Sequence, residues 1–150
     1  MISTSKANSV LSVFFGRNDS LAADAYVYLG LSSTDLNADG TGFSEPTGAS
    51  YKRVLVGGKS AAGSEKKFGY PTNGIISNAS EIMFAPAREE WGKLTHWFLA
   101  TSQSGTGAAF LWGELTGDIV EKGVAAETVP VFYTDELKAS IDVPLTEATE

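Results

Sequence analysis

The stretch AYVYLGL, at residues 25–31, gives the clearest indication of the fold. Its apolar side chains alternate, so that Ala25, Val27, Leu29 and Leu31 share one face of an extended backbone. This alternation predicts a half-buried β-strand.

Six further segments show the alternation or the short apolar runs of strands, and clusters of Gly, Pro, Asn, Asp and Ser separate them. They cover residues 51–56, 81–85, 94–101, 108–115, 129–133 and 137–143. Seven short strands with a single helix predict an all-β fold, namely an antiparallel β-sandwich, with a barrel left open as the alternative.

A helical spacing precedes these strands. Between residues 4 and 15 the apolar side chains follow one another at i, i+3, i+4, i+7 and i+8, as on one face of an α-helix. They are Ala7, Val10, Leu11, Phe14 and Phe15. Two phenylalanines give a short helix a large apolar surface, so we expect the sheet or a neighbouring chain to cover this face. Val10, Leu11, Phe14 and Phe15 are therefore the predicted interface residues of the helix.

The length of 150 residues is that of one domain with one hydrophobic core. We expect a single β-rich domain over residues 1–143, led by the helix at residues 4–15. Residues 144–150 contain Glu147 and Glu150 and little that can be buried. They are predicted to form an acidic C-terminal tail.

Composition and charge exclude several classes of function. The chain has no cysteine, and its 18 acidic and 11 basic residues give a net charge of −7. This charge opposes binding to nucleic acids and to anionic membranes. The chain also lacks a run of about 18 apolar residues and the apolar segment of a secretory signal, so we expect synthesis in the cytoplasm and no membrane insertion.

Two connections, at residues 32–50 and 57–74, are long for a compact domain. The second carries Lys59, Lys66 and Lys67, which are candidate loop contacts.

Part of the first connection resembles a calcium-binding loop. Asp35, Asn37 and Asp39 alternate ahead of Gly40, as in the first half of such a loop. The twelfth position is Pro46, where a bidentate glutamate would be needed. The pattern therefore favours a solvated turn and leaves these three residues as a weak candidate metal site.

No catalytic constellation stands out. His96 is the only histidine, and it lies in a strand that is apolar on both faces, which is typical of a central strand. The adjacent carboxylates Glu89 and Glu90, and likewise Asp135 and Glu136, lie in turn-like sequence and point apart on an extended backbone. We therefore expect no enzymatic activity and no cofactor.

Trp91, Trp97, Trp112 and the five tyrosines are expected to lie in the core or in a subunit interface, because aromatic side chains commonly fill small sandwich cores. A sugar-binding platform is the alternative.

Several short motifs occur in a recognisable order along most of the chain. They are TSKAN at 4–8 before Leu11 and Phe15-Gly16, YVYLGLS at 26–32, DGTGFSEP at 39–46, YKRV at 51–54, WGKLTHW at 91–97, LWGEL at 111–115 and VPVF at 129–132. As an ordered set they resemble a family of small virion structural proteins of tailed bacteriophages, commonly labelled phage tail fibre protein.

This resemblance implies a non-catalytic structural subunit of the virion, present in many copies. It would act through protein–protein contacts, either as a tail or fibre component or as a capsid decoration protein. Its expected partners are other phage structural proteins and further copies of itself. The alternative is a receptor- or carbohydrate-binding module that uses the long loops and exposed aromatic side chains.

Overall fold

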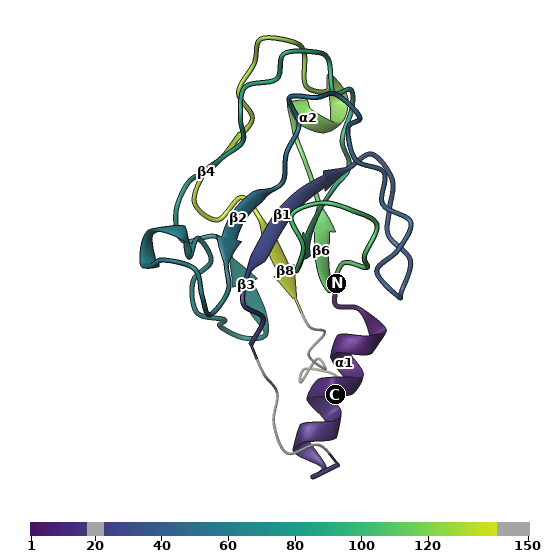
Figure 1. The fold of residues 1–150 in the computed structure, drawn as a ribbon, viewed down its shortest axis with the longest axis vertical. Coiled ribbons are helices and arrows are strands. Elements are labelled where there is room, and N and C mark those ends of the chain that lie inside the picture. Colours follow the sequence, from purple (N-terminus) through teal and green to yellow (C-terminus); the bar gives the residue numbers. More distant parts are fainter. Residues whose placement is uncertain (18–22, 141–150) are drawn as a thin grey trace, which may run out of the picture.

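A computed structural model describes residues 1–17 and 23–140 of the chain. The predicted tail at 144–150 and the last three residues of the predicted strand at 137–143 lie outside these ranges. Figure 1 shows how the helices and strands, given next in chain order, are arranged in space. They are α1 (Thr4–Phe14), β1 (Val27–Ser32), β2 (Val54–Gly57), the 3₁₀ turn η1 (Gly63–Glu65), β3 (Ile75–Ser77), β4 (Ile82–Met83), β5 (His96–Ala100), β6 (Leu111–Glu114), α2 (Asp118–Glu121), β7 (Val131–Phe132) and β8 (Lys138–Ser140).

The largest sheet has four antiparallel strands in the order β2-β1-β5-β6. In its centre Leu29 of β1 lies opposite Leu99 of β5, and Leu31 lies opposite Trp97. The strand with two apolar faces, β5, is a central strand, as its sequence predicts.

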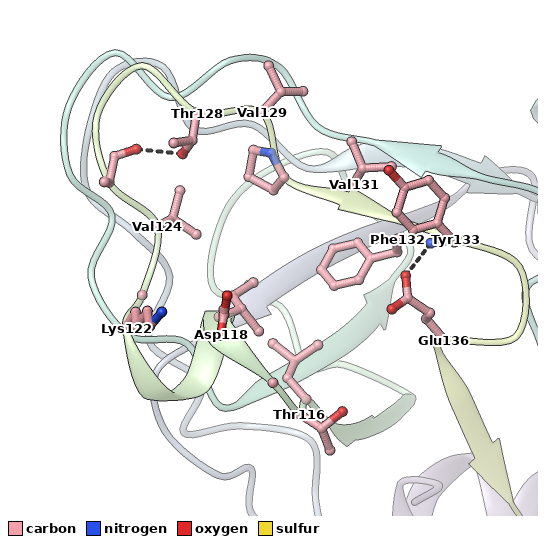
Figure 2. A pocket seen from close by; sticks show the side chains of 16 residues that line it. Thr116, Asp118, Lys122, Val124, Thr128, Val129, Val131, Phe132, Tyr133 and Glu136 are labelled. Carbon is pink, nitrogen blue, oxygen red and sulfur yellow. Dashed lines mark hydrogen bonds between the residues drawn. The ribbon is translucent and has the colours of Figure 1, made fainter.

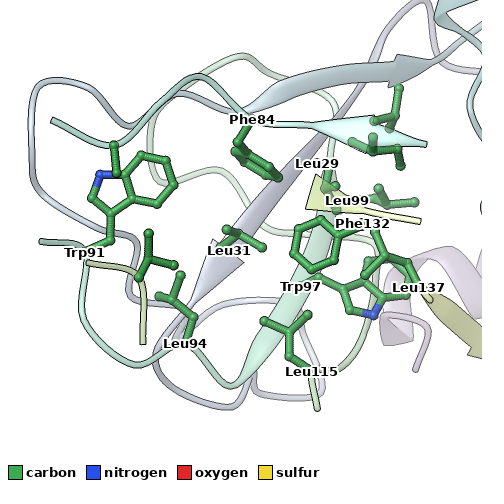
Figure 3. Close-up of a cluster of buried hydrophobic side chains, with 14 of the residues drawn as sticks. Leu29, Leu31, Phe84, Trp91, Leu94, Trp97, Leu99, Leu115, Phe132 and Leu137 are labelled. Carbon is green, nitrogen blue, oxygen red and sulfur yellow. The ribbon is translucent and has the colours of Figure 1, made fainter. Parts of the chain in front are cut away.

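Two small antiparallel ladders, β3-β8 and β4-β7, accompany the large sheet. Leu29, Leu31 and Trp97 of the large sheet pack in one buried cluster with Phe132 and Leu137, which lie on or next to the ladders. Figure 3 shows these side chains meeting between the layers. The predicted all-β, sandwich-like fold is therefore confirmed, and the described strands do not close into a barrel.

The prediction that β1 is only half-buried is wrong. Gly30 and Ser32, on the face opposite to Leu29 and Leu31, are buried as well. A side chain at Gly30 would collide with the ring of Phe98, since an ideal Cβ would lie 2.3 Å from it.

The residues that cover this second face come from the long connection between β1 and β2. Leu36 is buried with Phe98 and Trp112 in a second cluster, and Phe43 stacks on Phe98 with ring centroids 4.4 Å apart. Because the loop folds back over the sheet, both β1 and β5 are buried on two sides.

Three short elements are not predicted from the sequence. η1 and β3 have only three residues each and α2 only four. Such short segments carry too few side chains to show a periodic pattern.

Candidate protein–protein interface

The N-terminal residues join the helix α1 to the edge of the large sheet. Ile2 forms an antiparallel bridge with Leu111 of β6, and the Ser3 N–H donates to the Phe110 carbonyl at 2.9 Å. The Ser3 side chain then caps the helix, since its Oγ accepts a hydrogen bond from the Lys6 N–H at 3.2 Å. The start of the helix is thus fixed by backbone pairing and by a buried cap.

Only the first turn of α1 makes specific contacts with the rest of the described chain. The Thr4 N–H and hydroxyl both donate to the Ala38 carbonyl, at 3.0 and 3.1 Å. The Lys6 ammonium lies 3.5 Å from a carboxylate oxygen of Asp24 and 5.1 Å from the centre of the Phe110 ring. In Figure 1 the helix leads away from the sheet below these contacts.

The predicted apolar stripe is therefore not covered by the sheet. Among residues 4–14 none is buried, and Val10 is only half-buried. Leu11 is 55% exposed, Phe14 80% and Phe15 77%. Of the two possibilities that the sequence leaves open, cover by the sheet is wrong, and cover by a neighbouring chain stays a prediction.

A pocket of about 700 Å³ lies beside α2, and we call it the α2 pocket. Figure 2 shows that its walls come from the segments that contain α2 and β7. Val129 and Tyr133 are 43% and 60% exposed at this pocket, and Phe132 is buried beneath it. Its lining residues are 115–119, 122–125, 128–133 and 136.

An apolar groove of about 440 Å³ lies next to the base of α1. Ile2, Phe110, Leu111 and Ile76 line it, and the groove shares several of these residues with an adjoining hollow of about 590 Å³.

The three candidate loop lysines do not form one site. Lys59 and Lys66 line the adjoining hollow and are exposed. Lys67 is half-buried, and its backbone N–H donates to the Val56 carbonyl at 2.8 Å. Lys59 and Lys66 therefore remain candidates for contact with a partner, whereas Lys67 mainly holds the loop at residues 57–74 in place.

The weak candidate metal site has the hydrogen bonds of a local turn. Asp39 accepts bonds from the Thr41 N–H at 3.1 Å and from its hydroxyl at 2.6 Å, and these bonds lower the pKa of Asp39. Asn37 also donates to Thr41, whereas Asp35 faces His96 with 3.2 Å between their nearest atoms. The three side chains are thus engaged with different partners. Nowhere in the described part of the chain do three or more His, Cys, Asp or Glu side chains gather closely enough to hold a metal ion.

The single histidine is partly buried and has two polar neighbours. Its Nδ1 lies 2.9 Å from the Thr95 hydroxyl, and its Nε2 faces the Asp35 carboxylate. The Thr95 hydroxyl also donates to the Ser32 carbonyl at 3.5 Å.

The paired carboxylates point to separate partners. Glu89 accepts hydrogen bonds from the Ser50 hydroxyl and the Trp91 indole N–H, and these bonds lower its pKa. Asp135 accepts from the Ser77 hydroxyl at 2.8 Å, and Glu136 accepts from the Tyr133 N–H. These carboxylates therefore stabilise turns.

All three tryptophans are buried, with 7%, 0% and 4% of Trp91, Trp97 and Trp112 exposed. These three are core residues and offer no exposed ring to a sugar. Tyr26, Tyr70 and Tyr133, in contrast, are 43%, 99% and 60% exposed, so the prediction of a place in the core is wrong for them. Within residues 1–17 and 23–140, no helix is both long and apolar enough to cross a membrane.

The fold and this surface define a β-sandwich protein that carries an apolar helix at its edge. A family model described as Podophage GP4 fiber I protein gp80 matches residues 1–140. The chain belongs to this family, which confirms the resemblance to phage tail fibre proteins. It is thus a viral structural protein, a fibre-type component of the phage tail and of the virion. The curated proteins include no significant match to the chain.

Proposed function

We propose that this chain is a non-catalytic subunit of the fibre and that it acts by binding other phage structural proteins through the exposed face of α1. The family supports a structural role in the tail. The finer assignment, contact through the helix, rests on one observation. Phe14 and Phe15 are mostly exposed at the end of α1 that is remote from the sheet.

Exposed aromatic pairs of this kind are a recognised feature of interfaces. A phenylalanine can bury about 150–250 Å² when a partner covers it, and aromatic residues are enriched in interface cores. Leaving two such rings in water is unfavourable by the same reasoning. Contact with a neighbouring subunit would remove this penalty.

The attachment of α1 suits this role. Within residues 1–17 and 23–140, the polar contacts that hold the helix are at its first turn, made by Ser3, Thr4 and Lys6. The remaining turns are thereby presented to a partner without disturbing the core of the domain.

The experiment uses phage particles that lack this protein. Purified wild-type chain is mixed with such particles, and binding is measured by co-sedimentation. We expect the double variant Phe14→Ser/Phe15→Ser to lose most of its binding while the folded domain keeps its circular dichroism spectrum.

Tyr70→Ser is the matched control, because Tyr70 is 99% exposed but lies outside α1. It should bind particles like the wild type. If the double variant binds particles as well as the wild type does, the helix is not the contact surface. The same conclusion follows if soluble glycans compete away the binding of the wild type.

A further inference from the structure

The described molecule has an exposed apolar feature at each of two opposite ends. In Figure 1 α1 lies at one end of the long axis and α2 at the other. The first end presents Phe14 and Phe15, and the second presents the α2 pocket with Val129 and Tyr133 at its opening.

The charges of these two ends are opposite. Residues 4–17, which we call the arm, contain Lys6 and Arg17 and no acidic residue. Lys6 is partly neutralised by Asp24 at 3.5 Å, so Arg17 is the charge at the far end of the arm. Residues 115–136, which include every lining residue of the α2 pocket, carry five acidic residues and one lysine, all exposed. They are Asp118, Glu121, Glu127, Asp135, Glu136 and Lys122. Of these, Asp118, Glu136 and Lys122 line the pocket itself. Glu127 is partly neutralised by Arg88 at 3.3 Å, which leaves the region clearly acidic.

The sizes of the two features also agree. A volume of about 700 Å³ lies within the range of roughly 300–1,000 Å³ that accommodates drug-sized molecules, and two phenyl rings are no larger than these. The pocket lining includes the apolar residues Ile119, Val124 and Val131 and the carboxylates of Asp118 and Glu136.

We propose that the arm of one copy of this chain inserts into the α2 pocket of a second copy. Phe14 and Phe15 would occupy the pocket, and Arg17 would lie against the acidic rim near Asp118. The inference rests on the proposed function, in which the arm is a protein contact, and it identifies the partner as the chain itself.

Such a contact is heterologous, because it joins two different surfaces. Each copy in a pair keeps one free arm or one free pocket, so further copies can add at either end. An arm-to-arm contact would instead bring together two positively charged segments that carry no acidic residue. Charge complementarity therefore favours arm-to-pocket over arm-to-arm pairing.

Two variants, each defective at one end, test this arrangement. The arm variant is Phe14→Ser/Phe15→Ser. The pocket variant is Asp118→Lys/Val129→Lys, which places positive charge where the arm would bind. Ile75→Lys is the matched control for Val129→Lys, since the two side chains are 45% and 43% exposed and Ile75 does not line the pocket.

The measurement is sedimentation velocity over a range of concentrations. Wild type and Ile75→Lys should associate into species that grow with concentration. Each defective variant alone should remain monomeric, with a dissociation constant raised about tenfold or more, as expected when a central contact of an interface is removed. An equimolar mixture of the two defective variants should form dimers and nothing larger, because it contains one working arm and one working pocket per pair.

Other outcomes overturn the inference. If the pocket variant associates like the wild type while the arm variant does not, the arms pair with each other or bind elsewhere. If the mixture stays monomeric, or if the wild type is monomeric at every concentration, the arm has no binding site in the α2 pocket.

The particle-binding experiment separates this inference from the proposed function. An arm variant that fails to bind particles, combined with a wild type that never self-associates, would leave the proposed function standing and identify a different protein as the partner of the arm.

Discussion

The guanidinium of Arg53 donates to both carboxylate oxygens of Glu45, from Nε at 2.8 Å and from Nη2 at 2.9 Å. Its other N–H groups donate to the carbonyls of Ser102 and Gly105, at 2.9 and 2.8 Å. The Arg53 side chain is 1% exposed, and Phe98 packs against it with 5.1 Å between the guanidinium and the ring centre. One side chain thus ties two loops to the edge of the large sheet.

Replacing Arg53 should therefore destabilise the fold strongly. Arg53→Met removes two hydrogen bonds from the Glu45 carboxylate, which keeps the one from the Tyr51 hydroxyl, and it takes this donor from two carbonyls. We expect a loss of about 3–5 kcal/mol in the free energy of unfolding. Urea denaturation measures this loss. Arg88→Met is the control, because the Arg88–Glu127 pair is 68% and 70% exposed and should contribute no more than about 1 kcal/mol. Similar losses for both variants would contradict the structural role of Arg53.

A second prediction concerns alkaline pH. Burial, followed by the hydrogen bond to Glu45, raises the pKa of Tyr51 well above its ordinary value of 10.0. In the unfolded chain Tyr51 loses its proton near pH 10, whereas in the folded chain it stays neutral. The folded state is therefore fully favoured below about pH 10 and loses up to about 1.4 kcal/mol per pH unit above it.

Tyr51→Phe is the comparison for this prediction. It should cost about 1–3 kcal/mol at neutral pH, because the Leu31 N–H loses its acceptor and Glu45 loses a donor. Above pH 10, however, its stability should fall less steeply than that of the wild type. Parallel pH profiles from urea denaturation would show that Tyr51 is not the group responsible.

The third prediction contrasts an exposed with a buried phenylalanine. A covered helix stripe would make Phe14→Ala cost about 3–5 kcal/mol. Since Phe14 is 80% exposed, we expect a change of no more than about 0.5 kcal/mol in dilute solution. Phe84→Ala should show the large loss, because Phe84 is 1% exposed in the core. Thermal unfolding followed by circular dichroism distinguishes the two cases.

The fourth prediction is that the loop at residues 35–40 does not bind calcium tightly. Asp39 is held by Thr41, Asp35 faces His96, and the position that would supply a bidentate glutamate is Pro46. Calorimetry should detect no micromolar binding of calcium by the wild type. Such binding, if Asp39→Ala abolished it, would restore the loop as a metal site.

The sequence predicts the local elements of this fold well and its long-range contacts poorly. Alternation and helical spacing depend on neighbouring side chains, which is why β1, β5 and α1 are found close to where they are expected. The cover over the second face of β1 depends on Leu36 and Phe43, which lie seven positions apart in a polar loop and form no regular pattern. The periodicity of the sequence likewise does not predict the ion pair between Arg53 and Glu45.

The candidate interface, too, is predicted only in part from the sequence. The amphipathic pattern identifies Leu11, Phe14 and Phe15 as a surface in need of a partner, but it cannot tell whether the sheet or another chain covers them. The α2 pocket is not predicted at all, because separate loop segments form it and its apolar residues are spread along them. Only the tertiary structure brings these residues together.

The burial of β1 and β5 on both faces also sets how fast their backbone exchanges hydrogen with the solvent. Their amide protons are paired within the centre of the sheet, so deuterium can replace them only when the whole domain opens. In the described part of the chain, the polar contacts of α1 with other segments are at its first turn, and the amides of its last turns can exchange through local fraying. Deuterium uptake should therefore divide the protein into a slow pair of strands and a fast helix, and the binding of a partner to the helix should be visible as a slowing of the fast class.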